Sequence, residues 1–155
     1  MPSRRIELVM PASSAAAFEV FHNHTVRLEW DTLLAAAFVE GGGPHPYPGA
    51  ITVNRGRGWK RLLGMRTQFL TYDPPRLAAA ALIAPTGIFA QWAASMSHRD
   101  RPDEMSDLIY TFTIKLRPRW LSWLFDPIAA RVFERETRLR FAAMASYLRD
   151  RNQRR

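Results

Sequence analysis

The alternation of hydrophobic and polar positions predicts that the chain begins with one strand and two short helices. Side chains alternate over residues 4–10 and a proline follows, which is typical of a half-buried strand. Ser13 or Ser14 is expected to cap a helix over residues 15–22, and a second short helix is expected over residues 25–31.

Six further strands are expected in the middle of the chain. Residues 41–49 contain three prolines and four glycines, so this segment is expected to be an irregular loop. The alanine-rich run 76–84 also fits a helix, but its short length and the prolines at both ends favour a strand. Short connections make each step a hairpin and the sheet antiparallel. The expected strands cover residues 34–40, 50–54, 65–72, 76–84, 88–98 and 108–117.

The period of the pattern changes from 2 to 3.6 after residue 117, which predicts a helical C-terminal part. Residues 118–125 are expected to form a short helical turn. Asp126 and Pro127 are typical of the N-cap and first residue of a new helix, which is expected to end near Arg149. Its expected apolar stripe consists of Ile128, Val132, Phe133, Leu139, Ala143, Met144 and Tyr147.

Together these elements predict one α+β domain over residues 1–155, with mobile ends at 1–3 and 151–155. A twisted antiparallel sheet does not cover its own concave face, so the long helix is expected to lie across a seven-stranded sheet. Many inward positions carry small side chains, among them Ala90, Ala94 and the run Ala78–Ala81. We therefore expect a cavity between the sheet and the C-terminal helix.

Three segments carry a resemblance to a known family. They are the run 12–21 after the first strand, the Glu29-Trp30-Asp31 segment, and the turn 73–77 with its Asp-Pro-Pro sequence. With the order of elements, they resemble the START-like helix-grip superfamily (SRPBCC), in its polyketide cyclase/dehydrase and lipid-transport branch. The resemblance implies a cavity for a lipid, polyketide, quinone or similar molecule. It does not imply one reaction, because fold does not determine function.

A charged pair lies on the expected inner face of the C-terminal helix. Glu136 falls within the apolar arc and Arg140 follows one turn later, at the spacing of an ion pair. The pair could orient a ligand, and a desolvated Glu136 could act as a base. The alternative, favoured over this one, is a purely structural ion pair.

The expected ligand-binding residues are large side chains on the inner faces together with that charged pair. Tyr110 adds a hydroxyl to an otherwise apolar pocket, although plain core packing is an equal alternative. His98 is a second candidate base near the rim, or else a solvated residue at a strand end. The histidines lack metal-ligand spacing, so neither a metal nor a cofactor is expected. The ligand-binding set is Trp30, Trp92, Met96, Tyr110, Phe112, Val132, Glu136 and Arg140.

Two basic patches with interleaved tryptophans suit an anionic membrane surface. The alternative, favoured for both, is a solvated surface whose tryptophans fold back onto the sheet. The first patch consists of Arg55, Arg57, Trp59, Lys60 and Arg61, and the second of Arg117, Arg119, Trp120 and Trp123.

The charge and its distribution along the chain limit the classes of partner that we expect. The chain has 22 Lys+Arg against 14 Asp+Glu, a net charge of +8. Residues 41–72 hold five basic and no acidic residues, and residues 131–155 hold eight Arg against three acids, so each segment carries +5. Because the positive charge is gathered in two patches, the sequence does not favour a general nucleic-acid-binding protein.

The absence of cysteine excludes disulfides, thiolate metal sites and a cysteine nucleophile. It also fits a reducing compartment, and the sequence contains no signal-like or membrane-spanning run, so a soluble cytoplasmic protein is expected.

Three functions follow in order of preference. The first is a carrier or sensor for a small hydrophobic or amphipathic ligand. The second is a polyketide cyclase/dehydrase-like enzyme that uses the same cavity, and the third is a membrane-docking module.

Overall fold

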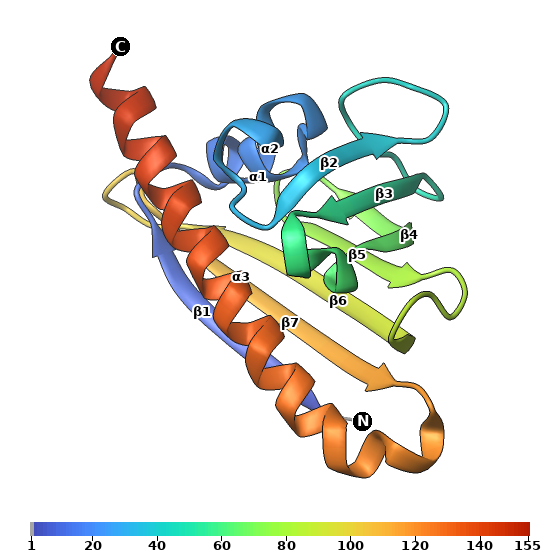
Figure 1. Cartoon of the computed structure of the whole chain (residues 1–155). Coiled ribbons are helices and arrows are strands. Elements are labelled where there is room, and N and C mark those ends of the chain that lie inside the picture. The colour runs from blue at the N-terminus through green and yellow to red at the C-terminus, as the bar shows by residue number, and fades with distance from the viewer. Residues whose placement is uncertain (1) are drawn as a thin grey trace.

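The observed elements follow the predicted order along the chain. The computed structural model describes residues 2–155 (Figure 1). Its strands are β1 (Ser3–Met10), β2 (Leu34–Val39), β3 (Ile51–Gly56), β4 (Met65–Asp73), β5 (Leu77–Leu82), β6 (Phe89–Asp100) and β7 (Ser106–Leu116). Its α-helices are α1 (Ser14–His22), α2 (His24–Trp30) and α3 (Ser122–Gln153), and its 3-10 helices are η1 (Gly58–Leu63) and η2 (Arg119–Leu121).

The strands form one seven-stranded antiparallel sheet in the order β1-β7-β6-β5-β4-β3-β2. Strands β2 to β7 form a meander, and β1 returns to pair with β7, where Ile6 lies opposite Tyr110. The alanine-rich run is strand β5, so the helical alternative for it is wrong. Figure 1 shows α3 lying across the sheet, with α1 and α2 near its C-terminal half. The predicted α+β architecture is confirmed.

The segment after β3 is more ordered than the basic turn expected there. Strand β3 continues to Gly56, and residues 58–63 form η1. A Cβ atom on Gly56 would lie 2.0 Å from the carbonyl oxygen of Lys60, so only glycine allows η1 to fold back this tightly. This return places the side chains of Lys60 and Leu63 toward α3.

The long helix begins earlier than predicted. It starts at Ser122, so Asp126 is not its N-cap, and Pro127 lies inside the helix. The Asp126 carboxylate instead accepts a hydrogen bond of 2.8 Å from the backbone N–H of Leu116, at the end of β7. A proline this close to a helix N-terminus removes a single intrahelical hydrogen bond, so the helix continues through it.

The buried face of α3 also differs from the predicted stripe. Phe133 and Met144 are buried as expected, but Ile128, Val132 and Leu139 are exposed. The stripe was wrong because the face that packs on the sheet includes polar side chains. The buried residues of α3 are Asp126, Ala130, Phe133, Glu136, Thr137, Arg140, Phe141, Met144, Ala145 and Leu148.

None of the helices within residues 2–155 combines the length and the apolar character needed to cross a membrane.

Candidate functional site

A small cavity lies between the sheet and α3. It has a volume of about 70 Å³, and side chains from α1, α2, α3, η1 and strands β2 to β7 line it. Small side chains on two adjacent strands create this space, namely Ala78, Ala79 and Ala80 of β5 and Ala94 of β6. The lining includes part of the predicted alanine run, but not Ala81 or Ala90.

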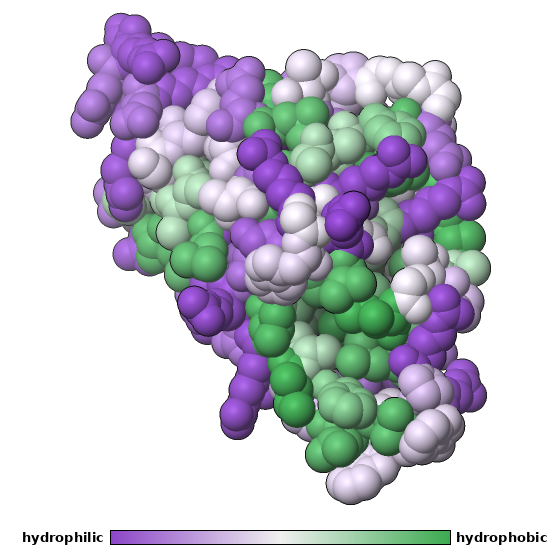
Figure 2. All heavy atoms as spheres, in the orientation of Figure 1, coloured by the Kyte–Doolittle hydropathy of each residue, from purple (hydrophilic) through white to green (hydrophobic). Residues whose placement is uncertain are grey.

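A larger apolar groove adjoins the cavity. It has a volume of about 390 Å³ and lies between η1, the end of β7 and the N-terminal part of α3. Leu63 of η1 lines both spaces, so the cavity and the groove approach each other at this side chain. Figure 2 shows hydrophobic residues gathered around a hollow at this place.

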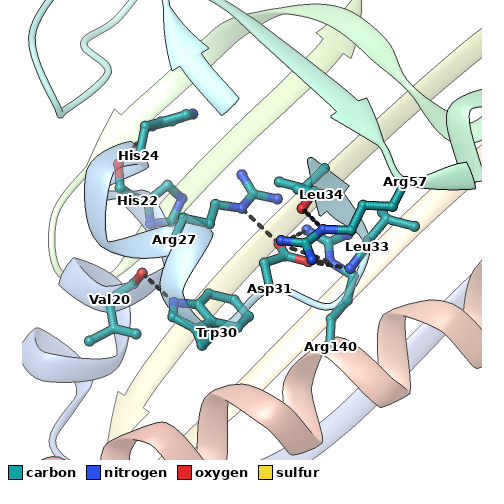
Figure 3. A network of polar contacts seen from close by, with 10 residues as sticks. All are labelled: Val20, His22, His24, Arg27, Trp30, Asp31, Leu33, Leu34, Arg57 and Arg140. Carbon is teal, nitrogen blue, oxygen red and sulfur yellow. Dashed lines mark hydrogen bonds and ion pairs between the residues drawn. The ribbon is translucent and has the colours of Figure 1, made fainter. Parts of the chain in front are cut away.

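Buried charges meet at the inner side of the cavity, where α2 approaches α3 (Figure 3). The Nη2 atom of Arg140 donates to Oδ2 of Asp31 at 2.9 Å, and its Nε donates to Oδ1 at 3.0 Å. The Nε of Arg27 donates to the same Oδ2 at 3.0 Å. All three side chains are buried, and both arginines line the cavity.

Local sequence positions this cluster. Arg27 and Asp31 lie one helical turn apart, which brings their side chains together on the same face. Asp31 also accepts the backbone N–H of Leu33 at 3.0 Å, and this bond fixes the carboxylate at the end of α2. Burial alone would raise the pKa of Asp31, but the charges of Arg140 and Arg27 outweigh it and hold this pKa below its usual value.

The Arg27 guanidinium in the cluster is charged at neutral pH. Burial and the neighbouring Arg140 lower the pKa of Arg27 to about 10, which still leaves it protonated. Its guanidinium carbon also lies 4.4 Å from the centre of the Phe21 ring, a cation–π contact. Two cations therefore share one carboxylate inside the protein.

The predicted pair of Glu136 with Arg140 is wrong. Both side chains are buried, as expected, but Arg140 turns to Asp31 and Glu136 turns to η1. The Nζ of Lys60 lies 3.0 Å from Oε2 of Glu136, at an angle that makes an ion pair without a directed hydrogen bond. Lys60 is therefore not part of the predicted surface patch, and its ion pair links η1 to α3.

The cavity contains only part of the predicted ligand-binding set. Its lining includes Trp92, Met96, Tyr110 and Arg140, while Val132 lines the adjoining groove. The rest of the set, Trp30, Phe112 and Glu136, lies outside the lining.

Two of these outlying residues have clear packing roles. The indole N–H of Trp30 donates to the carbonyl oxygen of Val20 at 3.1 Å, and Phe112 packs on Phe133 with ring centres 4.8 Å apart.

His98 is buried rather than solvated at a strand end. It packs edge-on against Phe18, with ring centres 5.6 Å apart, and it is not part of the cavity lining. Burial lowers its pKa to about 4, and burial likewise lowers the pKa of His24 to about 4. The neutral ring of His98 therefore belongs to the packing between α1 and the sheet.

Sequence reasoning missed Arg27 as a site residue, although the i,i+4 spacing of Arg27 and Asp31 was visible. It also missed polar side chains on β3 and β4. The hydroxyls of Thr52 and Thr67 lie 3.0 Å apart in the lining, and the side-chain oxygen of Asn54 has no hydrogen-bond partner within residues 2–155.

Comparison with known proteins identifies the fold. No family model and no curated protein sequence matches the chain. Among solved structures, a START superfamily protein from Mycobacterium smegmatis matches with a TM-score of 0.73 and 8% identity, over 94% of this chain and 98% of that one. The chain has the same helix-grip fold as this START superfamily protein.

Two further structures share the helix-grip fold. Ara h 8.0201 matches with a TM-score of 0.70 and 11% identity, over 96% of this chain and 98% of that one. The di-domain ARO/CYC BexL from the BE-7585A biosynthetic pathway matches with a TM-score of 0.75 and 7% identity. That match covers 96% of this chain and 47% of BexL.

We expect Asp31→Asn to destabilise the protein by about 3–5 kcal/mol, because it leaves two buried guanidiniums without a carboxylate. Urea unfolding at neutral pH measures this loss. Glu134→Gln is the control, since it breaks only partly exposed pairs with Arg138 and Arg4 and is expected to cost less than about 1 kcal/mol. Equal, small effects of both substitutions would contradict the structural role of the cluster.

Stability is expected to fall as the pH drops from about 6.5 to about 4. The pKa of His98 in the folded state lies below its unfolded value, so the unfolded chain binds the proton first and is favoured by acid. Each such histidine contributes about 1.4 kcal/mol per pH unit in this window. Urea unfolding of His98→Phe should therefore show a smaller loss between pH 7 and pH 5 than the parent protein, by about 2 kcal/mol. An unchanged loss would show that His98 does not titrate as described.

Proposed function

We propose that this protein binds a small hydrophobic or amphipathic molecule between the sheet and α3, as a carrier or sensor. The observation that carries the proposal is the pairing of an alanine-lined cavity with an apolar groove that adjoins it at Leu63. A cavity of about 70 Å³ holds little more than a few waters, so a ligand would displace Leu63 and extend into the groove.

A binding role is favoured over an enzymatic one by the placement of the candidate bases. Glu136 is tied to Lys60, and His98 packs against Phe18, so neither faces the cavity. Burial raises the pKa of Tyr110 to about 12, so its hydroxyl stays protonated and serves as a hydrogen-bond donor or acceptor. Neither of the two predicted bases is therefore positioned in the cavity for a polyketide cyclase-like reaction.

Filling the cavity should abolish binding without unfolding the protein. Ala94→Leu places a larger side chain in the lining, and we expect at least a tenfold weaker affinity for the neutral fluorescent probe N-phenyl-1-naphthylamine. Ala93→Leu is the matched control, because the adjacent residue of β6 faces the other side of the sheet. Fluorescence titration compares both variants with the parent protein.

Two results would contradict the proposal. The first is the absence of probe binding by the parent protein. The second is equal weakening by both substitutions, which would place the probe outside the cavity. Thermal unfolding of each variant shows whether Ala94→Leu retains the fold.

A second function, docking on an anionic membrane, is favoured by exposed aromatic side chains beside the groove. Trp120 is 73% exposed, Trp123 is 76% exposed, and Trp59 on η1 is 57% exposed. The alternative that these tryptophans fold back onto the sheet is therefore wrong. Amphipathic aromatic rings of this kind favour the headgroup region of a bilayer.

Charge complementarity points to an anionic bilayer. Exposed Arg57 and Arg61 accompany Trp59, and exposed Arg117 and Arg119 accompany the other two tryptophans. Basic residues near an anionic surface contribute about 1 kcal/mol each. Docking on this face would bring the mouth of the groove against the lipid.

We expect the protein to cosediment with vesicles that contain phosphatidylglycerol and not with pure phosphatidylcholine vesicles. The double substitution Trp120→Ser/Trp123→Ser should remove binding, while Leu70→Ser, at a residue 64% exposed on β4, should not. Binding retained by the tryptophan variant would refute this docking surface. If that variant instead dissociates a dimer, the face is an interface between copies of this chain.

A further inference from the structure

The buried cluster at the inner side of the cavity holds one more positive charge than negative charge. Arg27 and Arg140 both pair with Asp31, and no other carboxylate pairs with either guanidinium among residues 2–155. Glu136 is neutralised by Lys60, and Asp126 lies on the first turns of α3, where it binds the end of β7. The cluster is therefore left with a net charge of +1.

The excess charge is directed toward the cavity through Arg27. Within the described part of the chain, its guanidinium makes one hydrogen bond, from Nε to Asp31. In Figure 3 no dashed line reaches its two terminal nitrogens. Arg27 lines the cavity, and the unused N–H donors of its guanidinium can bind an acceptor that enters this space.

Other polar atoms in the lining suit an oxyanion beside Arg27. The Tyr110 side chain lies near both arginines, whose charges act on its hydroxyl, and it stays protonated. Arg27 and Tyr110 offer N–H and O–H donors, as recognition of an anion requires.

We propose that the ligand is an amphipathic monoanion, a carboxylate with an apolar tail, whose head binds Arg27 beside the Asp31–Arg140 pair. Its tail passes Leu63 into the apolar groove. This inference rests on the proposed ligand-binding function and narrows it to one chemical class. The anion would bring the buried cluster to neutrality.

The length of the path sets the size of a suitable probe. Arg140 and Val132 lie eight residues apart on α3, which corresponds to about 12 Å at 1.5 Å per residue. An extended alkyl chain covers roughly 1.3 Å per bond, so a chain of about ten carbons reaches from the arginines into the groove. Decanoate and decan-1-ol thus form a matched pair that differs only in the charged head.

The test is displacement of bound N-phenyl-1-naphthylamine by each of the two ligands. For the parent protein, decanoate should displace the probe at a concentration at least ten times lower than decan-1-ol. Arg27→Gln should remove this preference by weakening decanoate at least tenfold, with little effect on decan-1-ol. The control Arg138→Gln, on the exposed side of α3, should keep the preference.

Each outcome separates this inference from the proposed function. Failure of the neutral probe to bind overturns the proposed function itself. Probe binding with equal displacement by the acid and the alcohol leaves that function standing and overturns the anionic class.

A preference that survives Arg27→Gln but disappears in high salt would assign the anion to the basic surface, and it also overturns the inference. If Arg27→Gln does not fold, displacement by decanoate and by decan-1-ol is compared between the parent protein and Arg27→Lys, and this comparison tests the inference. Arg27→Lys keeps the charge and should keep the preference for decanoate.

Discussion

The structure depends on one buried carboxylate. Asp31 closes α2 and accepts hydrogen bonds from Arg140, which lies 109 residues later on α3, and from Arg27 one turn earlier. This contact joins the short helices after β1 to the helix that crosses the sheet. A second ion pair, Lys60 with Glu136, joins η1 to the same helix. Between these contacts the elements are held apart, and the alanines of β5 and β6 leave the space unfilled.

The same contacts give the cavity its chemical character. Apolar side chains alone would favour any hydrophobic molecule of suitable size. Two guanidiniums on one carboxylate change this preference, because a buried charge needs a partner or must be neutralised. The polar head of a ligand is thus expected at the two arginines, and its apolar part in the groove beside Leu63. The exposed tryptophans lie at that apolar end.

Much of the fold was predictable because alternation and hairpin turns are local, and β5, which lacks alternation, was assigned from its short length and flanking prolines. Errors arose where distant segments decide the outcome. The stripe on α3 was misplaced because Glu136 and Arg140 are buried by partners on η1 and α2, which no helical periodicity reveals. Asp126 was predicted to be an N-cap, but its carboxylate instead accepts a hydrogen bond from the end of β7. Trp92, Met96 and Tyr110 line the cavity, and their inward positions follow from the alternation along a strand.

The most direct test of the account is the ionisation state of a bound carboxyl group. Carbon NMR of decanoate labelled at its carboxyl carbon reports this state in the complex. A cationic site lowers the carboxyl pKa, whereas an apolar cavity raises it. The bound carboxyl is expected to keep the chemical shift of the ionised form from about pH 8 down to about pH 6. A change to the shift of the protonated acid within that range would contradict it.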